Sequence, residues 1–256
     1  MKNDSTCLLR AEHIQRRYGG VWALRDVSLA IEAGQRIGII GPNGAGKTTF
    51  FNILAGRVPP SGGRVWLRGQ NVTGKHESWL CHQGLGRTFQ HNSLFAGLSV
   101  LENIRLAVQL RIGHNFQMFR SADKDVVVNE RARQLLSDVH LDAHAGAEVQ
   151  SLSYGVQRQV EIAVALAADP ELLLLDEPTA GMSPAETGSM IELICNLPRS
   201  ITILMVEHDM DAVFAIADRL VVLNQGQVLA DGTPEEIRAD QRVCDVYLSG
   251  GADVQH

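Results

Sequence analysis

A glycine-rich segment, residues 41–48, constrains the fold of this chain more than any other feature. It reads GPNGAGKT and matches the pattern G-x-x-x-x-G-K-[ST] at every fixed position. In such a loop, glycines let the backbone fold around a polyphosphate so that successive N–H groups point at it. Lys47 would then bridge the β- and γ-phosphates, and the Thr48 hydroxyl would bind Mg²⁺. The segment therefore predicts a phosphate-binding loop, called the phosphate loop below.

The residues on either side of the phosphate loop predict a strand before it and a helix after it. Residues 35–40 (QRIGII) form a nearly continuous apolar run, typical of a strand buried on both faces. Residues 48–55 show helical spacing of apolar side chains, and Gly56 is expected to end that helix. A chance match to the loop pattern is about 1% in a chain of this length, and the strand–loop–helix context makes chance less credible still.

Further apolar runs predict a mostly parallel sheet with helices on both faces. Buried strands are expected at residues 171–177, 201–206 and 219–223, with a helical segment at 210–217 between the last two. Strands that alternate with helices favour a parallel sheet in an α/β fold. The N-terminal part shows partial alternation and turn-rich segments, which predict further strands at residues 8–17, 27–32 and 63–67.

The middle of the chain changes to helical spacing, at residues 101–111 and 129–139, with few strand signals. We expect a single domain over residues 1–256. Its core would comprise residues 1–91 and 165–256, and residues from about 92 to 164 would form an inserted helical subdomain. Residues 111–130 show no pattern from which a role can be predicted.

The apolar run at residues 172–175 is followed by two carboxylates, Asp176 and Glu177. A carboxylate that ends a buried strand is costly unless it has a partner. Beside the phosphate loop that partner would be Mg²⁺, bound to Asp176 through a water. Glu177 is then placed to polarise an attacking water as a general base. Taken alone, the motif leaves open a charged pair at a strand end as the less favoured interpretation.

A third motif, LSYGV at residues 152–156, opens a helical segment. Ser153 is a favoured N-cap residue, and the first-turn N–H groups behind it can bind an anion. On these grounds alone, a simple capped helix is the more economical interpretation.

The order of the three motifs resembles that of the ATP-binding cassette (ABC) ATPases, over roughly residues 8–248. The resemblance implies an α/β P-loop NTPase core with a mostly parallel sheet, an antiparallel N-terminal β region and an inserted α-helical subdomain. It also implies ATP and Mg²⁺ as ligands, and an ATPase whose hydrolysis of ATP is coupled to transmembrane transport.

The same resemblance implies roles for residues outside the three motifs. Tyr18 is similar to the aromatic that stacks on adenine, and Gln90 to the glutamine that reaches Mg²⁺ and the water while sensing a membrane partner. His208 is similar to the histidine that contacts the γ-phosphate, and residues 180–183 to a loop that crosses a dimer interface. The expected catalytic residues are Lys47, Gln90, Glu177 and His208. The expected metal site comprises Thr48, Gln90 and Asp176. The expected nucleotide-binding residues are Tyr18, Gly41, Pro42, Asn43, Gly44, Ala45, Gly46, Lys47, Thr48, Thr49, Ser153 and Gly155.

The family's usual LSGGQ motif is here LSYGV, so Ser153 and Gly155 are retained while Val156 replaces an amide side chain. The effect of Val156 stays open. In a head-to-tail dimer, which the resemblance implies, the phosphate loop of one subunit and residues 153–155 of the other would enclose each ATP. The second ATPase subunit is either an identical chain or a sister subunit.

Four short strings narrow the resemblance to the ATPase subunits of bacterial branched-chain amino acid importers: residues 86–90, 94–103, 206–213 and 247–248. Relatives that serve urea, aromatic-acid or lipopolysaccharide transport share part of them. The importer resemblance implies transmembrane permease subunits as partners and, indirectly, a periplasmic or extracellular solute-binding protein. It places the protein peripherally at the cytoplasmic face of the cell (inner) membrane, with residues 90–103 meeting a permease helix.

Composition excludes several other classes. A net charge of −6 argues against nucleic acid as a partner, since nucleic-acid binding needs a basic surface. The apolar runs fall far short of the roughly 20 residues that span a bilayer, and the N-terminus lacks the apolar stretch of a signal peptide. Four scattered cysteines predict free thiols rather than disulfides. His140 and His144 would share a helix face, but no regular set of metal ligands is apparent.

Three other classes of protein could carry a phosphate loop. A small-molecule kinase has no use for the LSYG helix or for His208, and a GTP switch would be expected to carry an NKxD-type motif, which is not found. A soluble ABC protein of translation or DNA repair is the nearest alternative. Those proteins usually carry two cassettes or a long coiled coil, and this chain shows one cassette without sustained heptads.

Overall fold

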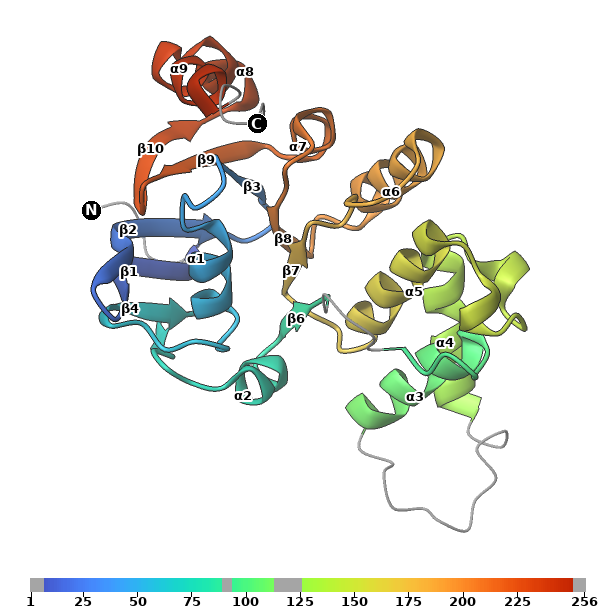
Figure 1. Cartoon of the computed structure of the whole chain (residues 1–256). Helices are drawn as coiled ribbons and strands as arrows, with labels where there is room; N and C mark the ends of the chain where they lie inside the picture. Colours follow the sequence, from blue (N-terminus) through green and yellow to red (C-terminus); the bar gives the residue numbers. More distant parts are fainter. Residues whose placement is uncertain (1–6, 89–93, 113–125, 251–256) are drawn as a thin grey trace.

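The computed structural model of the protein describes residues 7–88, 94–112 and 126–250. Within these ranges the strands form one ten-stranded sheet in the order β5-β4-β1-β2-β10-β9-β3-β8-β7-β6 (Figure 1). The strands are β1 (Cys7–Tyr18), β2 (Val21–Glu32), β3 (Arg36–Ile40), β4 (Gly62–Leu67), β5 (Gln70–Asn71), β6 (Leu85–Arg87), β7 (Leu172–Asp176), β8 (Thr202–Val206), β9 (Arg219–Asn224) and β10 (Gln227–Gly232).

Helices connect most of the strands and supply the middle of the chain. No helix in the described ranges combines the length and the apolar character needed to cross a bilayer. The helices are α1 (Lys47–Leu54), α2 (Glu77–His82), α3 (Val100–Ile112), α4 (Val126–Asp138), α5 (Tyr154–Leu166), α6 (Pro184–Asn196), α7 (Met210–Ile216), α8 (Pro234–Ala239) and α9 (Gln241–Gly250), with 3₁₀ turns η2 (Asp142–His144) and η3 (Val149–Ser151).

Strands β9, β3, β8, β7 and β6 run parallel to one another, as the alternation of strands and helices predicted. Every residue of β3, β7 and β8 is buried, which is the pattern of strands covered on both faces. Ile39 pairs with Val206, and Val206 pairs with Asp176. The carboxyl ends of β3, β8 and β7 therefore meet at one edge, where ligands bind in open α/β sheets.

The N-terminal strands form the antiparallel part of the sheet, because β1 pairs antiparallel with both β2 and β4. The predicted fold class is thus confirmed. β2 is longer than the alternation at residues 27–32 indicated, since it begins at Val21 directly after a two-residue turn. Its first residues are exposed or half-buried, so the hydrophobic pattern that marks a strand is weak there.

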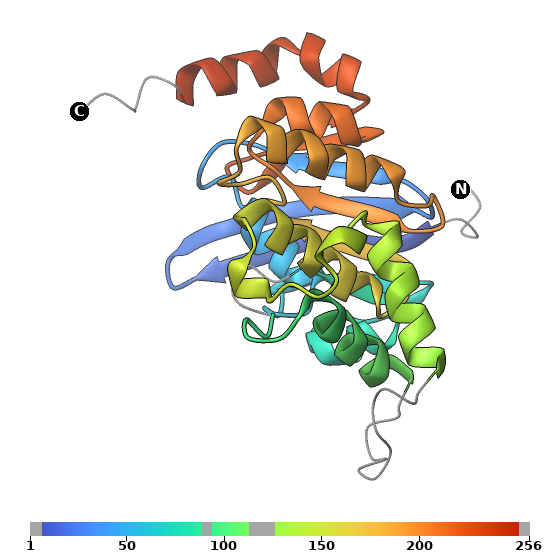
Figure 2. The ribbon, with the colours of Figure 1, turned by 90° about the vertical axis from the view of Figure 1, so that its right-hand side faces the viewer.

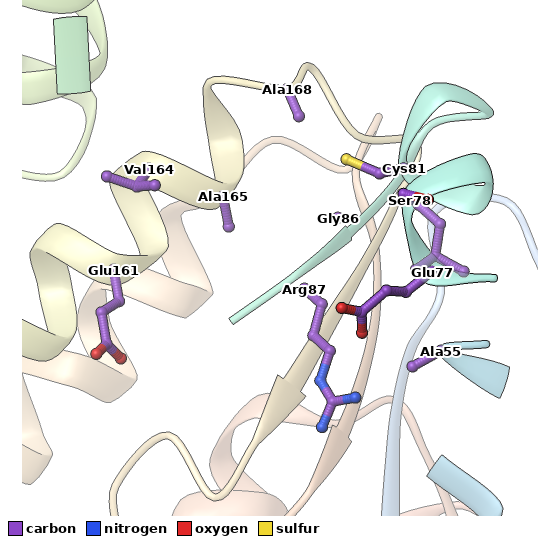
Figure 3. Close-up of a pocket in the computed structure, with 11 residues that line it drawn as sticks. Ala55, Glu77, Ser78, Cys81, Gly86, Arg87, Glu161, Val164, Ala165 and Ala168 are labelled. Carbon is purple, nitrogen blue, oxygen red and sulfur yellow. The ribbon is translucent and has the colours of Figure 1, made fainter. Parts of the chain in front are cut away.

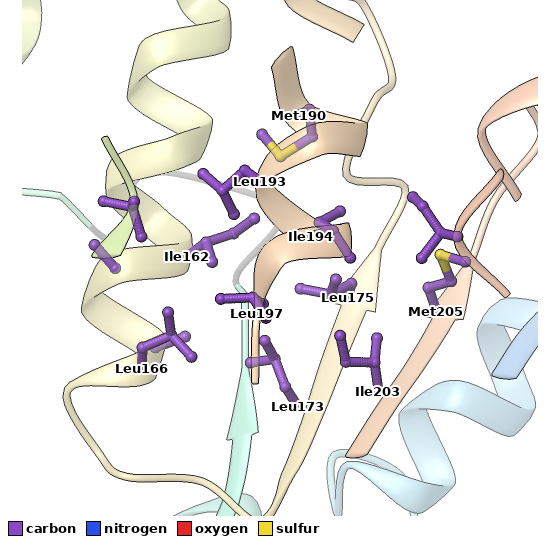
Figure 4. Close-up of a cluster of buried hydrophobic side chains, with 14 of the residues drawn as sticks. Ile162, Leu166, Leu173, Leu175, Met190, Leu193, Ile194, Leu197, Ile203 and Met205 are labelled. Atoms are coloured by element: carbon purple, nitrogen blue, oxygen red, sulfur yellow. The ribbon is translucent and has the colours of Figure 1, made fainter. Parts of the chain in front are cut away.

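The parallel strands are covered by different layers on their two faces. Leu172 and Leu174 of β7 belong to a hydrophobic cluster with Phe50 and Phe51 of α1. Side chains at the alternate positions point to the other face, where Leu173 and its neighbours pack against α5 and α6 (Figure 4). Helix α1 and the phosphate loop before it are thereby held against the sheet by packed apolar side chains.

Helices α3, α4 and α5 lie together at one side of the sheet (Figures 1 and 2). Their buried side chains, including Val100, Val128 and Val160, belong to the same hydrophobic cluster as Leu173 of β7. The helical part therefore shares a continuous core with the sheet. Helix α5 itself extends to Leu166, just past the end of the predicted subdomain. The subdomain boundaries stay a prediction.

The prediction that His140 and His144 share a helix face is wrong. Helix α4 ends at Asp138, and His140 has a left-handed backbone with φ of 57°. His144 lies in the separate 3₁₀ turn η2. Helical spacing therefore stops before the first of the two histidines.

Candidate nucleotide-binding and hydrolysis site

The phosphate loop leaves the carboxyl end of β3 and leads directly into α1. Gly41 has φ of 148°, and a Cβ placed on it would lie 2.1 Å from the carbonyl oxygen of Leu223. No side chain fits there, so this glycine is required by close backbone approach. Asn43 and Gly44 are exposed at the tip of the loop, and Thr48 is exposed in the first turn of α1. Residues 41–49 thus lie together as predicted.

The Lys47 side chain folds back over the loop that precedes it. Its Nζ donates hydrogen bonds to the carbonyl oxygens of Gly41 at 2.7 Å and Pro42 at 3.0 Å. Lys47 is only 5% exposed, and burial lowers the pKa of its ammonium group while the nearby Glu177 carboxylate raises it. The Lys47 side chain therefore lies across its own loop, where its ammonium group is among the groups that would contact a phosphate.

Asp176, at the carboxyl end of β7, is held by Arg87 of β6. Its Oδ2 accepts a hydrogen bond from Arg87 Nη2 at 3.2 Å, and neither side chain is more than 5% exposed. Arg87 also donates to Asn52 Oδ1 at 3.0 Å and stacks over the Phe51 ring. Burial raises the pKa of the Asp176 carboxyl, and Arg87 opposes that rise. Within the described residues, the buried Oδ1 of Asp176 has no hydrogen-bond partner.

Glu177, the next residue, leaves the strand with a left-handed backbone, at φ of 48°. Such a conformation costs about 1–3 kcal/mol in a non-glycine residue and persists only where its surroundings hold it. Its N–H donates to the Val206 carbonyl at 2.9 Å. Its Oε1 lies 2.9 Å from His208 Nε2. The structure thus brings the predicted base and the predicted histidine into direct contact.

Glu207 fixes the ends of β7 and β8 to one another. This residue is 2% exposed, and its Oε1 accepts hydrogen bonds from the backbone N–H of Thr179 at 2.8 Å and from its hydroxyl at 2.7 Å. Its Oε2 accepts from the His208 N–H at 2.9 Å. The Asp209 N–H also donates to Oε2, at 3.4 Å. A buried carboxylate is stable here because four donors satisfy it. Glu207 therefore positions the segment that carries Glu177 as well as the one that carries His208.

Ser153 stands at the N-cap position of α5, as predicted, but its side chain makes no capping hydrogen bond. The hydroxyl donates instead to Oε1 of Glu186 on α6, at 2.8 Å. The Gly155 N–H donates to the same oxygen at 3.1 Å. Bonds from the backbone and hydroxyl of Ser183, from Ser153 and from Gly155 lower the pKa of the Glu186 carboxyl to about 2.

Tyr18 ends β1 and is 47% exposed. The guanidinium of Arg16 lies 4.5 Å from the centre of the ring and donates to the Pro59 carbonyl at 2.8 Å. An arginine over a tyrosine face is an attractive contact that also orients the ring. Gln90 lies outside the described residues, so its predicted role stays a prediction.

A pocket of about 290 Å³ lies between α2, β6 and α5 (Figure 3). Its wall is mostly apolar, but Arg87 and Glu161 also line it. Arg87 is the same residue that pairs with Asp176, so the pocket wall and the end of β7 are joined by one side chain.

Four residues of the site were not singled out from the sequence: Arg16, Arg87, Glu186 and Glu207. Only Glu186 carries a local signal, because Ser183 and Glu186 form the S-x-x-E pattern of a capping box. Each of the other three also has a partner from a distant part of the chain: Pro59 for Arg16, Asp176 for Arg87 and Thr179 for Glu207.

The family model described as "ABC transporter" matches residues 24–180 of this chain. The chain therefore belongs to the ABC transporter family, and it is a nucleotide-binding ATPase subunit whose activity is coupled to transport. A second model, described as "Branched-chain amino acid ATP-binding cassette transporter", matches residues 227–248.

Curated relatives match over nearly the whole chain. The high-affinity branched-chain amino acid transport ATP-binding protein LivG of Salmonella typhimurium is 42% identical over 250 residues, covering 94% of this chain and 97% of LivG. BraF of Pseudomonas aeruginosa, with the same description, is 39% identical over the same shares. The lipopolysaccharide export system ATP-binding protein LptB of Escherichia coli is 35% identical over 241 residues, or 94% of this chain and 96% of LptB.

Solved structures of ATP-binding cassettes share the fold. The ADP conformation of one ABC transporter cassette matches with a TM-score of 0.83 and 30% identity, covering 94% of this chain and 98% of that one. A dimeric cassette in a post-hydrolysis state, bound to ADP and Pi, matches with a TM-score of 0.72 and 26% identity, covering 89% and 99%.

Arg87→Met should lower the free energy of unfolding by about 3 kcal/mol at pH 7, because it leaves a buried carboxylate without its counter-charge. Loss of Arg87 raises the folded-state pKa of Asp176 further above its unfolded value of about 3.9. Protonation then removes the penalty, so the deficit should be smaller at pH 5 than at pH 7. Urea denaturation at both pH values measures the loss in free energy of unfolding.

Two controls accompany this variant. Arg68→Met removes an arginine from the exposed pair with Glu171 and should cost less than about 1 kcal/mol. Arg87→Met combined with Asp176→Asn should recover much of the loss and its pH dependence. An equal deficit for Arg87→Met at pH 5 and pH 7 would contradict the proposed cause.

Proposed function

We propose that this ATPase subunit powers an importer of branched-chain amino acids or similar small polar solutes. The observation that carries the proposed chemistry is the meeting of Lys47, Asp176, Glu177 and His208 at one sheet edge. LivG and BraF, which match over 94% of the chain, and the branched-chain model at residues 227–248 support the cargo. LptB, at lower identity, supports lipopolysaccharide transport as the alternative.

We assign ATP to the phosphate loop and the tyrosine beside it. The half-exposed ring of Tyr18 would stack on adenine, with Arg16 already covering part of the ring. The Lys47 ammonium would exchange its two carbonyl partners for phosphate oxygens, to which charge-assisted bonds are stronger. The proposed nucleotide-binding residues are Tyr18, Gly41, Pro42, Asn43, Gly44, Ala45, Gly46, Lys47, Thr48, Thr49 and, from a second subunit, Ser153 and Gly155.

The residues at the strand ends also fit a Mg²⁺ site. Asp176 offers a buried carboxylate oxygen with no hydrogen-bond partner among the described residues, and Thr48 offers an exposed hydroxyl in the first turn of α1. Thr48 and Asp176 would hold the ion, together with Gln90 as the resemblance implies. When bound, Mg²⁺ neutralises charge on the phosphates.

We assign the hydrolytic step to Glu177. Its carboxylate would accept a proton from the water that attacks the γ-phosphate, as a general base. His208, 2.9 Å from that carboxylate, orients it and would donate to a γ-phosphate oxygen. Lys47 would stabilise the charge that develops on the phosphoryl group, and the fixed positions of these groups avoid reorganisation during the step.

A second subunit completes the proposed site. Ser153 and the N–H groups at the start of α5 form the terminus of a 13-residue helix, which favours negative charge. Brought to the γ-phosphate only on dimer closure, they make ATP bind the closed dimer better than the open one, and that difference can drive a conformational cycle. The dimeric cassette that this fold resembles supports such an arrangement.

The remaining partners belong to the membrane. We propose that permease subunits contact the side of the molecule at which β6 ends, next to the pocket of Figure 3. Residues 90–103, which we expect to meet a permease helix, follow β6 in the sequence. Arg87 would connect that side to Asp176. A solute-binding protein on the other side of the membrane would act indirectly, and this subunit would lie peripherally at the cytoplasmic face. The second ATPase subunit is an identical chain or a sister chain.

Lys47→Ala should weaken ATP binding about 10- to 100-fold, because a charged hydrogen-bonding group to phosphate is lost. Isothermal titration calorimetry with ATP measures the change. Lys75→Ala removes an exposed lysine outside the phosphate loop and should bind ATP like the parent protein. Equal affinity of the two variants would contradict the assignment of the loop.

Glu177→Gln should keep ATP affinity but reduce the turnover number about 10²- to 10⁴-fold, the usual contribution of a general base. Because ATP then persists, dimers should accumulate and be visible by size-exclusion chromatography. Glu192→Gln, at an exposed position of α6, serves as the control and should hydrolyse ATP normally. An unchanged turnover number in Glu177→Gln would rule out Glu177 as the base.

The cargo and partners can be tested by purifying the tagged protein from membranes and identifying the chains that accompany it by mass spectrometry. We expect transmembrane permease subunits. In liposomes, the purified complex should take up leucine only with ATP and a solute-binding protein, and a complex carrying Lys47→Ala should not. Recovery of lipopolysaccharide-transport components, with no leucine uptake, would favour the alternative cargo.

A further inference from the structure

We infer that Glu186 is a positioning residue that occupies the phosphate-binding donors of Ser153 and Gly155 in the single subunit, so that the γ-phosphate of a partner-bound ATP must displace its carboxylate for the dimer to close. The inference rests on the proposed function, in which those two donors bind ATP held by a second subunit.

The two donors converge on one oxygen. Glu186 Oε1 accepts from the Ser153 hydroxyl at 2.8 Å and from the Gly155 N–H at 3.1 Å. A hydroxyl and a helix-terminal N–H are the groups that bind a phosphate oxygen at the start of a helix. The carboxylate therefore stands where a phosphate oxygen would stand. A phosphate and this carboxylate cannot take the same two donors at once.

The contact is tight enough to require glycine. A Cβ placed on Gly155 would lie 2.8 Å from Cβ, Cγ and Oε1 of Glu186. Atoms do not approach so closely, so any side chain at position 155 would push Glu186 away or shift α6. Gly155 lies inside α5, where a helical backbone does not itself need glycine. The contact with Glu186 explains, from a single subunit alone, why the LSYG motif has a glycine at position 155.

Capping of α6 does not account for this contact. The capping box uses Oε2, which accepts from the Ser183 N–H at 3.0 Å and from the Ser183 hydroxyl at 2.8 Å. The other carboxylate oxygen, Oε1, takes no part in the capping box and accepts the hydrogen bonds from Ser153 and Gly155. Helix α8 begins with the same kind of capping box, formed by Thr233 and Glu236, at a place outside the candidate site. A capping box therefore forms without such a contact, and of these two glutamates only Glu186 uses its Oε1 for donors outside the box among the described residues.

Two consequences follow for closure of the dimer. The carboxylate carries a full negative charge at neutral pH, so it repels an approaching γ-phosphate until it moves aside. Its second oxygen holds Ser183, the last residue of the segment 180–183 that we expect at the dimer interface. Displacing Glu186 therefore loosens that segment in the same step. Closure is opposed until a phosphate is present to replace the carboxylate.

The test measures how tightly ATP-bound subunits dimerise. In the Glu177→Gln background, where ATP persists, Glu186→Gln keeps the size of the side chain but removes its charge. Neutral hydrogen bonds are about half as strong as charge-assisted ones, and the repulsion disappears. Sedimentation velocity with ATP at several protein concentrations should show a dimer dissociation constant lowered about tenfold. The matched control, Glu236→Gln in α8, should leave that constant unchanged.

A separate measurement distinguishes this effect from a change in ATP binding. Affinity of the single subunit for a fluorescent ATP analogue should be the same with and without Glu186→Gln, because the phosphate loop is untouched. Glu186→Asp is a second variant of the same contact. It can still cap α6, but its shorter side chain withdraws from Ser153, and it should also strengthen the dimer, by a smaller factor.

An unchanged or weaker dimer in both Glu186 variants, while the Glu177→Gln parent dimerises with ATP, would overturn the inference and leave the proposed function intact. An equal gain in Glu236→Gln would also overturn it, since helix capping would then be the cause. If the parent itself forms no dimer with ATP, the proposed dimeric site is wrong, and the inference falls with it.

Discussion

The parallel register of β3, β8 and β7 is the constraint on which the whole site depends. Because these strands are buried on both faces and paired residue by residue, Ile39, Val206 and Asp176 stand level at one edge. A shift of one residue in β7 would turn Asp176 and every leucine of the strand to the opposite face of the sheet. The apolar side chains packed on both faces leave no room for such a shift. The side chains at the edge are thereby positioned by the leucines and isoleucines buried in the strands behind them.

Polar contacts then set the order of side chains at that edge. Glu207 receives four hydrogen bonds from the segments after β7 and β8 and so ties those segments together. Glu177, directly after β7, has a left-handed backbone, and its N–H donates to the Val206 carbonyl. From this position the Glu177 carboxylate lies 2.9 Å from His208 Nε2. Backbone strain of this kind in a non-glycine residue clusters at functional sites.

The sequence was sufficient wherever the structural signal is local. The phosphate loop, the fully apolar strands and the end of α1 at Leu54, just before Gly56, all follow from short patterns. The three-residue strand β6 and the half-exposed β10 carry too little periodicity to be predicted. The pairs Arg87–Asp176 and Ser153–Glu186 join residues 89 and 33 positions apart. Such pairs form only when the chain folds, so no local sequence pattern predicts them.

The negative net charge of the chain has a specific consequence at the candidate site. A protein with a net charge of −6 has four carboxylates in the parts of the molecule proposed to bind ATP. Asp176, Glu177 and Glu207 lie at the strand ends beside the subunit's own phosphate loop, whereas Glu186 lies against the start of α5, proposed to meet ATP held by a second subunit. Each is engaged within the subunit: Asp176 by Arg87, Glu177 by His208, Glu186 by Ser153 and Gly155, and Glu207 by Thr179. Engaged carboxylates repel phosphate less than free ones, because their donors offset the field. Two of them also use donors that are proposed to bind phosphate: Glu177 is paired with His208, and Glu186 accepts from Ser153 and Gly155. In the proposed mechanism, closure of two such subunits on ATP would exchange the Glu186 carboxylate for a phosphate, and the free energy of that exchange would be the difference between two sets of charged hydrogen bonds. A small difference of this kind can be reversed when the γ-phosphate is cleaved, which is what a cycle of closing and reopening requires.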